Sequence, residues 1–317
     1  MQDIEQVSYL ASGEYNENWR VVGRSRAAGA ASFVCRINHG SQLEMADQAA
    51  YEFAALRAVA PSGLTPAPYF LSADAPGGAG AGAMLMEYLP GQPLDYRADL
   101  EGAARCLAGI HRLPPSPALI DYRQPLQDLV AEAGRLLSGR RPHPLPKQGA
   151  RLAAWLDELA RSADGAGVPM EWVAVVNTEV NSHNFLVEGD VVRLVDWEKA
   201  VNSTPYLDLA HFLAPTTTLW KRGYRLSVAE REQFFATYAT ASGGAVDAAE
   251  VAAGTAAVER FVLLRALSWC YMAYADYADR GADPATAAAD AGRRPRHHAT
   301  FARITEYLEG LDDLIPA

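Results

Sequence analysis

Two neighbouring stretches, VNTEVNSHNFLV at residues 176–187 and VVRLVDWEK at residues 191–199, decide how the middle of this chain folds. The apolar runs 185–187 and 191–195 flank a short segment that contains Gly189. Runs rich in β-branched residues on either side of a glycine turn predict a β-hairpin. A hairpin folds back on itself, so we expect Asn184, before its first strand, and Asp196, after its second, to lie side by side.

Hard oxygen donors gather around this hairpin. Glu179 lies five positions before Asn184, so one amide oxygen and the carboxylates of Glu179 and Asp196 are expected close together. Carboxylate and amide oxygens are the ligands that Mg²⁺ prefers in proteins. The sequence therefore predicts a magnesium site next to the hairpin.

The composition describes a chain with enough apolar residues for a large core and with an acidic surface. Half of the 317 residues are hydrophobic, and 38 acidic against 28 basic residues give a formal net charge of −10. This charge disfavours nucleic acid and anionic membranes as partners. It fits a cationic or neutral small substrate, and it fits ordinary solubility equally well.

The cysteines and the chain start indicate a cytoplasmic protein. Cys35, Cys106 and Cys270 lie far apart within apolar segments, so we expect buried thiols in a reducing compartment. The first residues lack the pattern of a signal peptide, and no apolar run approaches membrane-spanning length.

The periodicity predicts an α+β chain of two lobes. A β-rich lobe is expected over residues 1–89 and a mainly helical lobe over residues 90–317, with the change of pattern at Leu89-Pro90-Gly91. The strands are expected at residues 7–10, 19–22, 31–37, 69–72 and 83–88, with one helix at 44–59. The later helices are expected at residues 99–113, 126–137, 148–161, 206–213, 228–239, 248–279 and 299–314.

The first lobe contains two features that suit phosphate groups. The loop with Ser12, Gly13 and Asn16 lies between two strands and can offer peptide N–H groups to a phosphate, although plain hairpins look the same. Arg36 lies inside an apolar strand and needs an anionic partner, for which Glu52 on the following helix is suitable. That pair is either a structural salt bridge or a device that aims Arg36 at a phosphate.

In this order the parts resemble the choline kinase and aminoglycoside phosphotransferase superfamily, whose fold is related to that of protein kinases. Residues 177–186, NTEVNSHNFL, resemble the catalytic loop, where His-Gly-Asp or His-Asn-Asp precedes Asn-Ile-Leu at the same spacing. Residues 195–199, VDWEK, resemble the Asp-Phe-Glu segment. Residues 206–212, YLDLAHF, are similar to the Tyr-Asp-Ile-Ala-Asn-His-Phe that follows it. The resemblance covers nearly the whole chain.

The resemblance implies a bilobal, protein-kinase-like fold and an ATP- and Mg²⁺-dependent transfer of phosphate to a small-molecule hydroxyl. It implies catalytic roles for Glu179, Asn184 and Asp196, and a metal site of Asn184, Asp196 and Glu198. The nucleotide contacts that it implies are Ser12, Gly13, Asn16, Arg36, Glu52, Glu87 and Leu89, the last two with adenine. The acceptor contacts that it implies are Glu179, Trp197, Trp220, Trp269 and Tyr271, with Asp276 and Asp279 nearby. The aromatic residues after position 268 suit a hydrophobic core as well as a pocket.

One departure from the family pattern leaves three interpretations open. Glu179 stands where the family has aspartate, and Asn177 where it has histidine; the extra methylene moves the carboxylate by about 1.5 Å. Glu179 is the base in a site rebuilt around it, which is the interpretation we favour, or the chain binds nucleotide without efficient transfer, or it transfers the nucleotidyl group. The acceptor stays open among amino alcohols such as choline, aminoglycosides, sugars and nucleosides.

Overall fold

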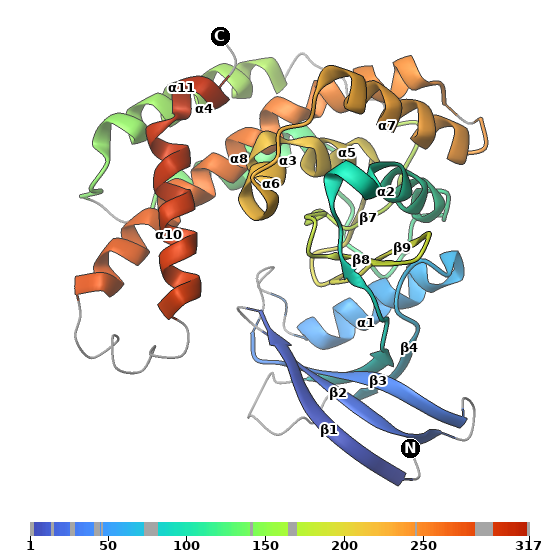
Figure 1. Cartoon of the computed structure of the whole chain (residues 1–317). Helices are drawn as coiled ribbons and strands as arrows, with labels where there is room; N and C mark the ends of the chain where they lie inside the picture. The colour runs from blue at the N-terminus through green and yellow to red at the C-terminus, as the bar shows by residue number, and fades with distance from the viewer. Residues whose placement is uncertain are drawn as a thin grey trace.

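The computed structural model joins an N-terminal antiparallel sheet region to a larger helical region (Figure 1). It describes residues 3–13, 16–25, 29–40, 45, 47–72, 82–139, 142–163, 170–244, 246–282 and 294–315. The change from sheet to helices occurs between residues 87 and 96, and the lobe boundary predicted after residue 89 falls within this interval. The predicted bilobal α+β fold is confirmed.

The sheet has the strand order β1-β2-β3-β5-β4 with antiparallel neighbours. Its strands are β1 (Asp3–Ser12), β2 (Asn16–Ser25), β3 (Gly29–Asn38), β4 (Pro68–Ser72) and β5 (Ala83–Glu87). The first three strands are longer than expected. Helix α1 (Gln48–Val59) lies between the sheet and the helical region, and the short helix η1 (Ala60–Ser62) follows it (Figure 1). The predicted start of α1 at residue 44 lies outside the described residues.

The chain passes from the sheet region to the helical region beside the hairpin. Strand β6 (Gln92–Pro93) pairs with β8 (Phe185–Glu188), which pairs in turn with β9 (Val191–Leu194). Gly91, with φ of 143°, permits the approach, since a Cβ there would lie 2.9 Å from the Val187 carbonyl oxygen. The predicted hairpin is confirmed, and Gly189 makes its turn with φ of 58°.

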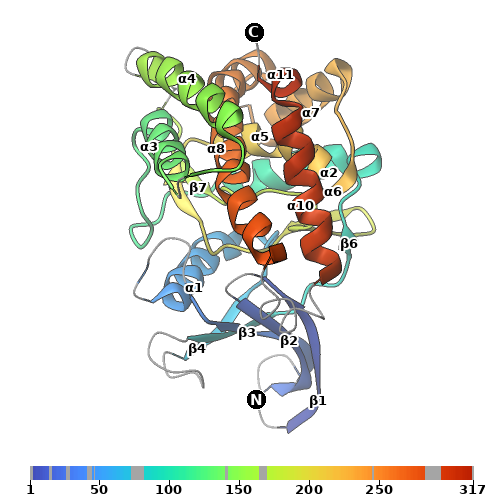
Figure 2. The same cartoon turned by 90° about the vertical axis from the view of Figure 1, so that its left-hand side faces the viewer.

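The helical region is built around the long helix α8 (Ala248–Ala282). Figure 2 shows α10 (Arg294–Glu309) on one side of α8 and α3 (Pro125–Leu137) with α4 (Pro146–Ala163) on the other. The remaining elements of this region are α2 (Tyr96–His111), β7 (Ala174–Val176), β10 (Val201–Ser203), α5 (Tyr206–Leu213), α6 (Pro215–Arg222), α7 (Val228–Ala241) and α11 (Leu311–Leu314).

Two of these helices differ from the expectation. Residues 215–222 were not expected as a helix, yet α6 begins with Pro215 and ends at Gly223, which has φ of 58°. Proline at the first position and glycine past the end are common helix boundaries. The single helix expected over residues 299–314 is interrupted at Gly310. None of the helices in the described part of the chain is long and apolar enough to cross a membrane.

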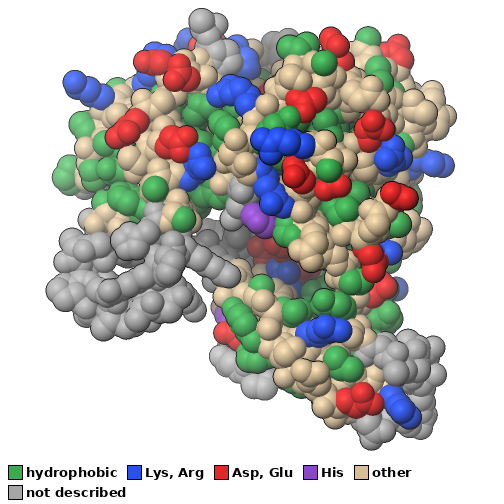
Figure 3. All heavy atoms as spheres, viewed as in Figure 1, with side chains coloured by type: hydrophobic (Ala, Val, Ile, Leu, Met, Phe, Trp, Pro, Cys, Tyr) green, Lys and Arg blue, Asp and Glu red, His purple; other side chains and the backbone are tan. Residues whose placement is uncertain are grey.

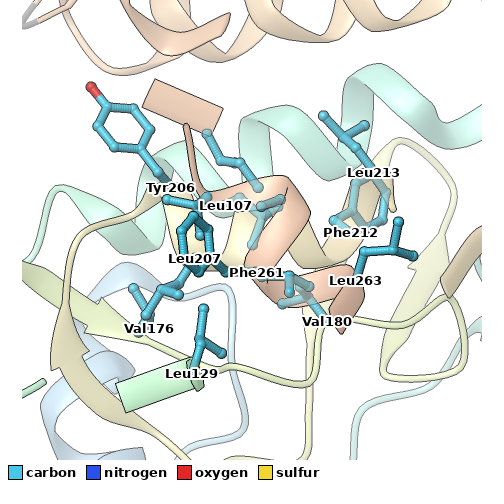
Figure 4. Packing of buried hydrophobic residues seen from close by; sticks show 14 of the residues in the cluster. Leu107, Leu129, Val176, Val180, Tyr206, Leu207, Phe212, Leu213, Phe261 and Leu263 are labelled. Carbon is cyan, nitrogen blue, oxygen red and sulfur yellow. The ribbon is translucent and has the colours of Figure 1, made fainter. Parts of the chain in front are cut away.

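The main core lies where α2, α5 and α8 meet the loop before the hairpin (Figure 4). Leu107, Phe212 and Val180 have no exposed surface. Val180 belongs to the loop between Glu179 and Asn184, so burial of its side chain fixes this loop against the core. The apolar packing thereby positions the polar residues on either side.

Helices α5 and α8 approach closely at a glycine. A Cβ on Gly254 of α8 would lie 2.5 Å from the ring of Tyr206, the first residue of α5. Gly134 of α3 has more room, because a Cβ there would meet its nearest neighbour at 3.7 Å. The two helical glycines therefore make a matched pair for substitution.

We predict opposite effects of alanine at these two glycines. Gly254→Ala forces α5 and α8 apart and lowers the free energy of unfolding by about 1–3 kcal/mol. Gly134→Ala removes backbone freedom from the unfolded chain and raises it by about 0.5–1 kcal/mol. Urea denaturation followed by circular dichroism measures both, and equal effects of the two changes would contradict the tight contact.

Candidate active site

The hairpin brings Asn184 and Asp196 together as predicted. The peptide N–H of Val195 donates to the carbonyl oxygen of Asn184 over 2.8 Å, so the two residues lie on adjacent chains. The Asn184 side-chain nitrogen donates to the carbonyl oxygen of Glu179 over 2.9 Å. Because its side-chain nitrogen is used in this bond, the amide oxygen of Asn184 is the atom that can contact a ligand.

A guanidinium and three carboxylates meet beside this pair. Arg36 of β3 donates to Asp196 over 2.7 Å and to Glu198 over 3.0 Å. Its Nε lies 3.0 Å from the carboxylate of Glu52 on α1. The expected pair of Arg36 and Glu52 is therefore present, and it is part of a larger cluster that joins the sheet region to the hairpin.

The cluster carries more negative than positive charge. Its three carboxylates surround one guanidinium whose side chain is only 6% exposed. Burial raises the pKa of the Glu52 carboxyl to about 8, against the lowering effect of Arg36. Burial and the neighbouring Asp196 also raise the pKa of Glu198. A divalent cation at this place would offset the excess charge.

The loop after β1 reaches the same cluster. The side-chain nitrogen of Asn16 donates to the carboxylate of Glu198, and the side chain of Asn38 donates to the Asn16 amide oxygen over 2.9 Å. The peptide N–H of Gly13 donates to the carbonyl oxygen of Asn16 over 2.9 Å, and the Ser12 hydroxyl accepts from Tyr9 over 2.9 Å. The tip of the loop, residues 14 and 15, lies outside the described residues. Asn16 thus belongs to the charged cluster, whereas the phosphate contacts of Ser12 and Gly13 stay predictions.

The oxygen donors present suit Mg²⁺. The described residues contain no group of three or more His, Cys, Asp or Glu side chains arranged to hold a metal ion. Magnesium, however, is usually held by one or two carboxylates together with phosphates and water. Asn184, Asp196 and Glu198 supply such a partial ligand set, which a nucleotide would complete. Their role as ligands stays a prediction.

The residues predicted to contact adenine lie on the connection out of β5. The peptide N–H of Glu87 donates to Ala67 over 2.8 Å, and its carboxylate accepts from the Ala67 N–H over 3.1 Å. The side chain of Leu89 is buried, and its peptide N–H donates to no other backbone group in the described part of the chain. Leu89 is thus able to donate to a nucleotide, whereas the N–H of Glu87 is already used.

The loop that carries Glu179 is held by a buried carboxylate. Asp208 of α5 accepts the peptide N–H groups of Asn177 and Thr178, each over 2.7 Å. Thr178 has φ of 67°, which is strained for a β-branched residue. His111 adds a contact with Asp208 at 3.2 Å. Asp208 therefore stabilises the backbone conformation of the two residues that precede Glu179.

Two further contacts fix Thr178. Its hydroxyl donates to the carbonyl oxygen of Lys199 over 3.0 Å. Its own carbonyl oxygen lies 2.5 Å from Nδ1 of His211, which must carry the proton because a carbonyl only accepts. Burial, with the nearby Arg265, lowers the pKa of His211 to about 4, so this imidazole is neutral at physiological pH. His211 has a positioning role here.

Glu179 is paired with a lysine that the sequence did not single out. The Lys199 ammonium donates to the Glu179 carboxylate over 2.8 Å. Burial raises the pKa of Glu179, but Lys199, with smaller contributions from Arg265 and His211, lowers it, and the net shift is downward. Glu179 is therefore an ionised carboxylate at neutral pH.

A cavity of about 310 Å³ opens beside Glu179 and Lys199. Trp220 of α6 and Trp269 of α8 line it, with ring centroids 5.8 Å apart and an interplanar angle of 70°. Figure 3 shows that acidic and basic side chains gather in the hollow between the two regions of the molecule. The placement of both tryptophans agrees with their predicted acceptor contacts, which stay predictions.

The other aromatic residues expected in the acceptor site lie elsewhere. Trp197 has no exposed surface, and its indole N–H donates to the Leu194 carbonyl oxygen over 3.2 Å, so it is a core residue. Tyr271 stacks on His143 with centroids 3.6 Å apart and does not line the cavity. Asp276 is exposed outside the cavity, and the side chain of Asp279 lies outside the described residues.

Asp208 and Lys199 are the main residues that the sequence analysis left without a role. Asp208 had a signal in the sequence, because one acidic residue inside the apolar run 206–213 needs a buried partner. Lys199 had no such signal, because its sequence context does not distinguish it from a lysine on the exposed surface.

We predict that Asp208→Asn loosens the loop before the hairpin. Asparagine keeps one acceptor oxygen but removes the charge and sets an NH₂ group against a peptide N–H. The free energy of unfolding should fall by about 2–4 kcal/mol, and the amides of Asn177 and Thr178 should exchange faster in hydrogen-exchange mass spectrometry. Asp157→Asn, on the exposed side of α4, is the control and should change neither. Unchanged exchange in Asp208→Asn would show that the loop is held by other contacts.

Known structures share this architecture. Choline kinase LicA from Streptococcus pneumoniae is 16% identical with a TM-score of 0.60, covering 96% of this chain and 95% of that one. A choline/ethanolamine kinase family protein from Mesorhizobium loti is 18% identical with a TM-score of 0.55, covering 96% and 92%. Spectinomycin phosphotransferase APH(9)-Ia, solved with ADP and spectinomycin, is 10% identical with a TM-score of 0.60, covering 98% and 94%. At these identities the likeness shows the fold alone.

The sequence itself is assigned by a family model. No curated protein matches the chain significantly. The model of the phosphotransferase enzyme family matches residues 6–253, which include most of β1 and the other strands of the sheet region, the charged cluster and the loop that carries Glu179. This chain belongs to the phosphotransferase enzyme family.

Proposed function

We propose that this protein transfers the γ-phosphoryl group of Mg²⁺-bound ATP to a hydroxyl group of a small molecule. The observation that carries the proposal is the meeting of Arg36, Asp196 and Glu198 within 3.0 Å, next to the loop that holds Glu179. Phosphoryl transfer depends mainly on positioning and charge stabilisation. This cluster supplies fixed charges of both signs at one place.

Each part of the cluster has a distinct task in this proposal. Arg36, held by Glu52, binds phosphate oxygens, and the Leu89 peptide N–H donates to adenine. Asn184, Asp196 and Glu198 hold the cation. Bound there, Mg²⁺ neutralises charge on the phosphates and orients them. The nucleotide phosphates would replace Asp196 as the hydrogen-bond acceptor of Arg36, and the Asp196 carboxylate would then be available to bind the cation.

Glu179 orients the acceptor hydroxyl and receives its proton. The acceptor oxygen forms a bond to the γ-phosphorus while the bond from that phosphorus to the bridging oxygen breaks, and ADP leaves with the electron pair. The proton of the hydroxyl passes to the Glu179 carboxylate. An ionised Glu179 beside the cavity is in the protonation state that this step needs.

A second candidate function is nucleotide binding without efficient transfer. It is favoured by the ion pair of Glu179 with Lys199, since a carboxylate with a lowered pKa is a weaker base. The two candidates differ in turnover: the binding protein retains ATP without forming a phosphorylated product.

Transfer to a mixed panel of amino alcohols, aminoglycosides, sugars and nucleosides tests the proposal, with products identified by mass. We predict a product heavier by one phosphoryl group, and a loss of at least about a hundredfold in rate for Asn184→Ala and Asp196→Ala. Asp190→Ala, on the exposed turn of the same hairpin, is the matched control and should retain activity. Full Mg²⁺-dependent transfer by Asn184→Ala and Asp196→Ala would rule out the proposed metal site. Adenylylated products would show that the protein transfers the nucleotidyl group instead of the γ-phosphoryl group.

The pH dependence of transfer tests the role of Glu179. Lys199 lowers the pKa of Glu179, so Lys199→Met should raise it and move the acid limb of the kcat/KM profile to higher pH. Lys147→Met, on the exposed surface of α4, should leave the profile unchanged. Glu179→Gln should retain ATP binding and lose transfer. If the acid limb of the Lys199→Met profile did not move, the limb would report the ionisation of a group other than Glu179.

A further inference from the structure

The cavity contains an arginine that the proposed function does not use. Arg265 of α8 lines the cavity, and its side chain is only 14% exposed. It forms an ion pair with Glu132 at 3.7 Å, a separation beyond hydrogen-bond length. Within the described part of the chain no hydrogen bond of the Arg265 guanidinium is present. A guanidinium with five N–H donors is costly to bury without acceptors, so a ligand oxygen would stabilise it.

Among the charged groups that line the cavity, Arg265 is the cation without a hydrogen-bonded acceptor in the described part of the chain. Lys199 is occupied by Glu179 over 2.8 Å, and His211 is neutral at physiological pH because its pKa is lowered to about 4. Counting Glu132 and Glu179 against Lys199 and Arg265, the formal charge of the lining is zero. Such a cavity has no net attraction for a polycation.

The dimensions of the cavity also restrict the acceptor. A volume of about 310 Å³ is at the small end of the range of ligand sites, about 300–1,000 Å³. Arg265 and Trp269 are four residues apart on α8 and therefore lie on one face of the helix. One wall thus combines a guanidinium with an aromatic ring, and Glu179 lines the same space.

We infer that the acceptor is a small hydroxy compound that also carries an anionic group, a carboxylate in the simplest case, bound by Arg265. This inference rests on the proposed function and names its substrate class. A carboxylate accepts two parallel N–H bonds from a guanidinium, which would fix the orientation of the molecule and so direct its hydroxyl group towards Glu179. A simple amino alcohol lacks the group that Arg265 would bind.

Matched pairs of acceptors that differ by one carboxylate test the inference. Suitable pairs are serine with ethanolamine, homoserine with 3-aminopropanol, glycerate with glycerol, and gluconate with sorbitol. Binding is measured first by calorimetry without nucleotide, and phosphoryl transfer from Mg²⁺-ATP is measured separately. In at least one pair the carboxylate-bearing member should bind at least about 30-fold more tightly.

Two variants of helix α8 locate the effect. Arg265→Gln should remove the preference, chiefly through KM, whereas Arg265→Lys, which keeps the charge, should retain part of it. Arg260→Gln is the matched control, because Arg260 lies on the same helix and pairs with Glu158 over 2.7 Å at the surface. If Arg265→Gln does not fold, the comparison within each pair on the unmodified protein still decides the question.

The outcomes separate this inference from the proposed function. Binding of a carboxylate-bearing acceptor that depends on Arg265, without transfer, would support the anion site and overturn the kinase proposal. Transfer to carboxylate-free members at equal efficiency, unaffected by Arg265→Gln, would support the kinase and overturn the inference. Failure of every carboxylate-bearing member to bind more tightly than its partner would also overturn it.

Discussion

The site depends on one buried carboxylate that accepts two peptide N–H groups. Asp208 has no exposed surface, and its bonds to the backbone of Asn177 and Thr178 hold Thr178 at a positive φ. Without this acceptor the two N–H groups would be buried and unpaired, and the loop would relax to a more common conformation. The packing of α5 against α8 at Gly254 places Asp208, so the apolar core determines the direction of Glu179.

Glu179 stands where the resemblance implies an aspartate, and its longer side chain is restrained by a neighbouring residue. A longer side chain has one more rotatable bond and a less certain carboxylate position. Here the bond from Lys199 restrains that carboxylate, and the Thr178 hydroxyl is bonded to the backbone of the same lysine. The restraint has a cost in basicity, because the same ammonium lowers the pKa of Glu179. Lys199 thus affects both the position and the proton affinity of the Glu179 carboxylate.

Local patterns in the sequence predicted the hairpin and the pair of Arg36 with Glu52, because alternation, a turn glycine and an unpaired charge are visible over short distances. The surroundings of single side chains were less predictable. Trp197 follows Asp196, whose positive φ turns the chain, and the sequence does not show that the indole then enters the core. The partners of Asp208 are backbone N–H groups, which every residue but proline has. The role of such residues requires the tertiary structure.

If the site binds metal and nucleotide as proposed, the contact of Arg36 with Asp196 makes binding an exchange of ionic partners. The guanidinium of Arg36 is the counter-ion of Asp196, the carboxylate that we propose as a ligand of the cation. A metal ion arriving alone must compete with this arginine, whereas a nucleotide brings phosphates that attract the arginine away. In the proposed reaction, metal and nucleotide would therefore assist each other's binding, and bare divalent ions would bind weakly. Under this proposal, selectivity for the complete metal–nucleotide complex would follow from one arginine that contacts both Asp196 and Glu198.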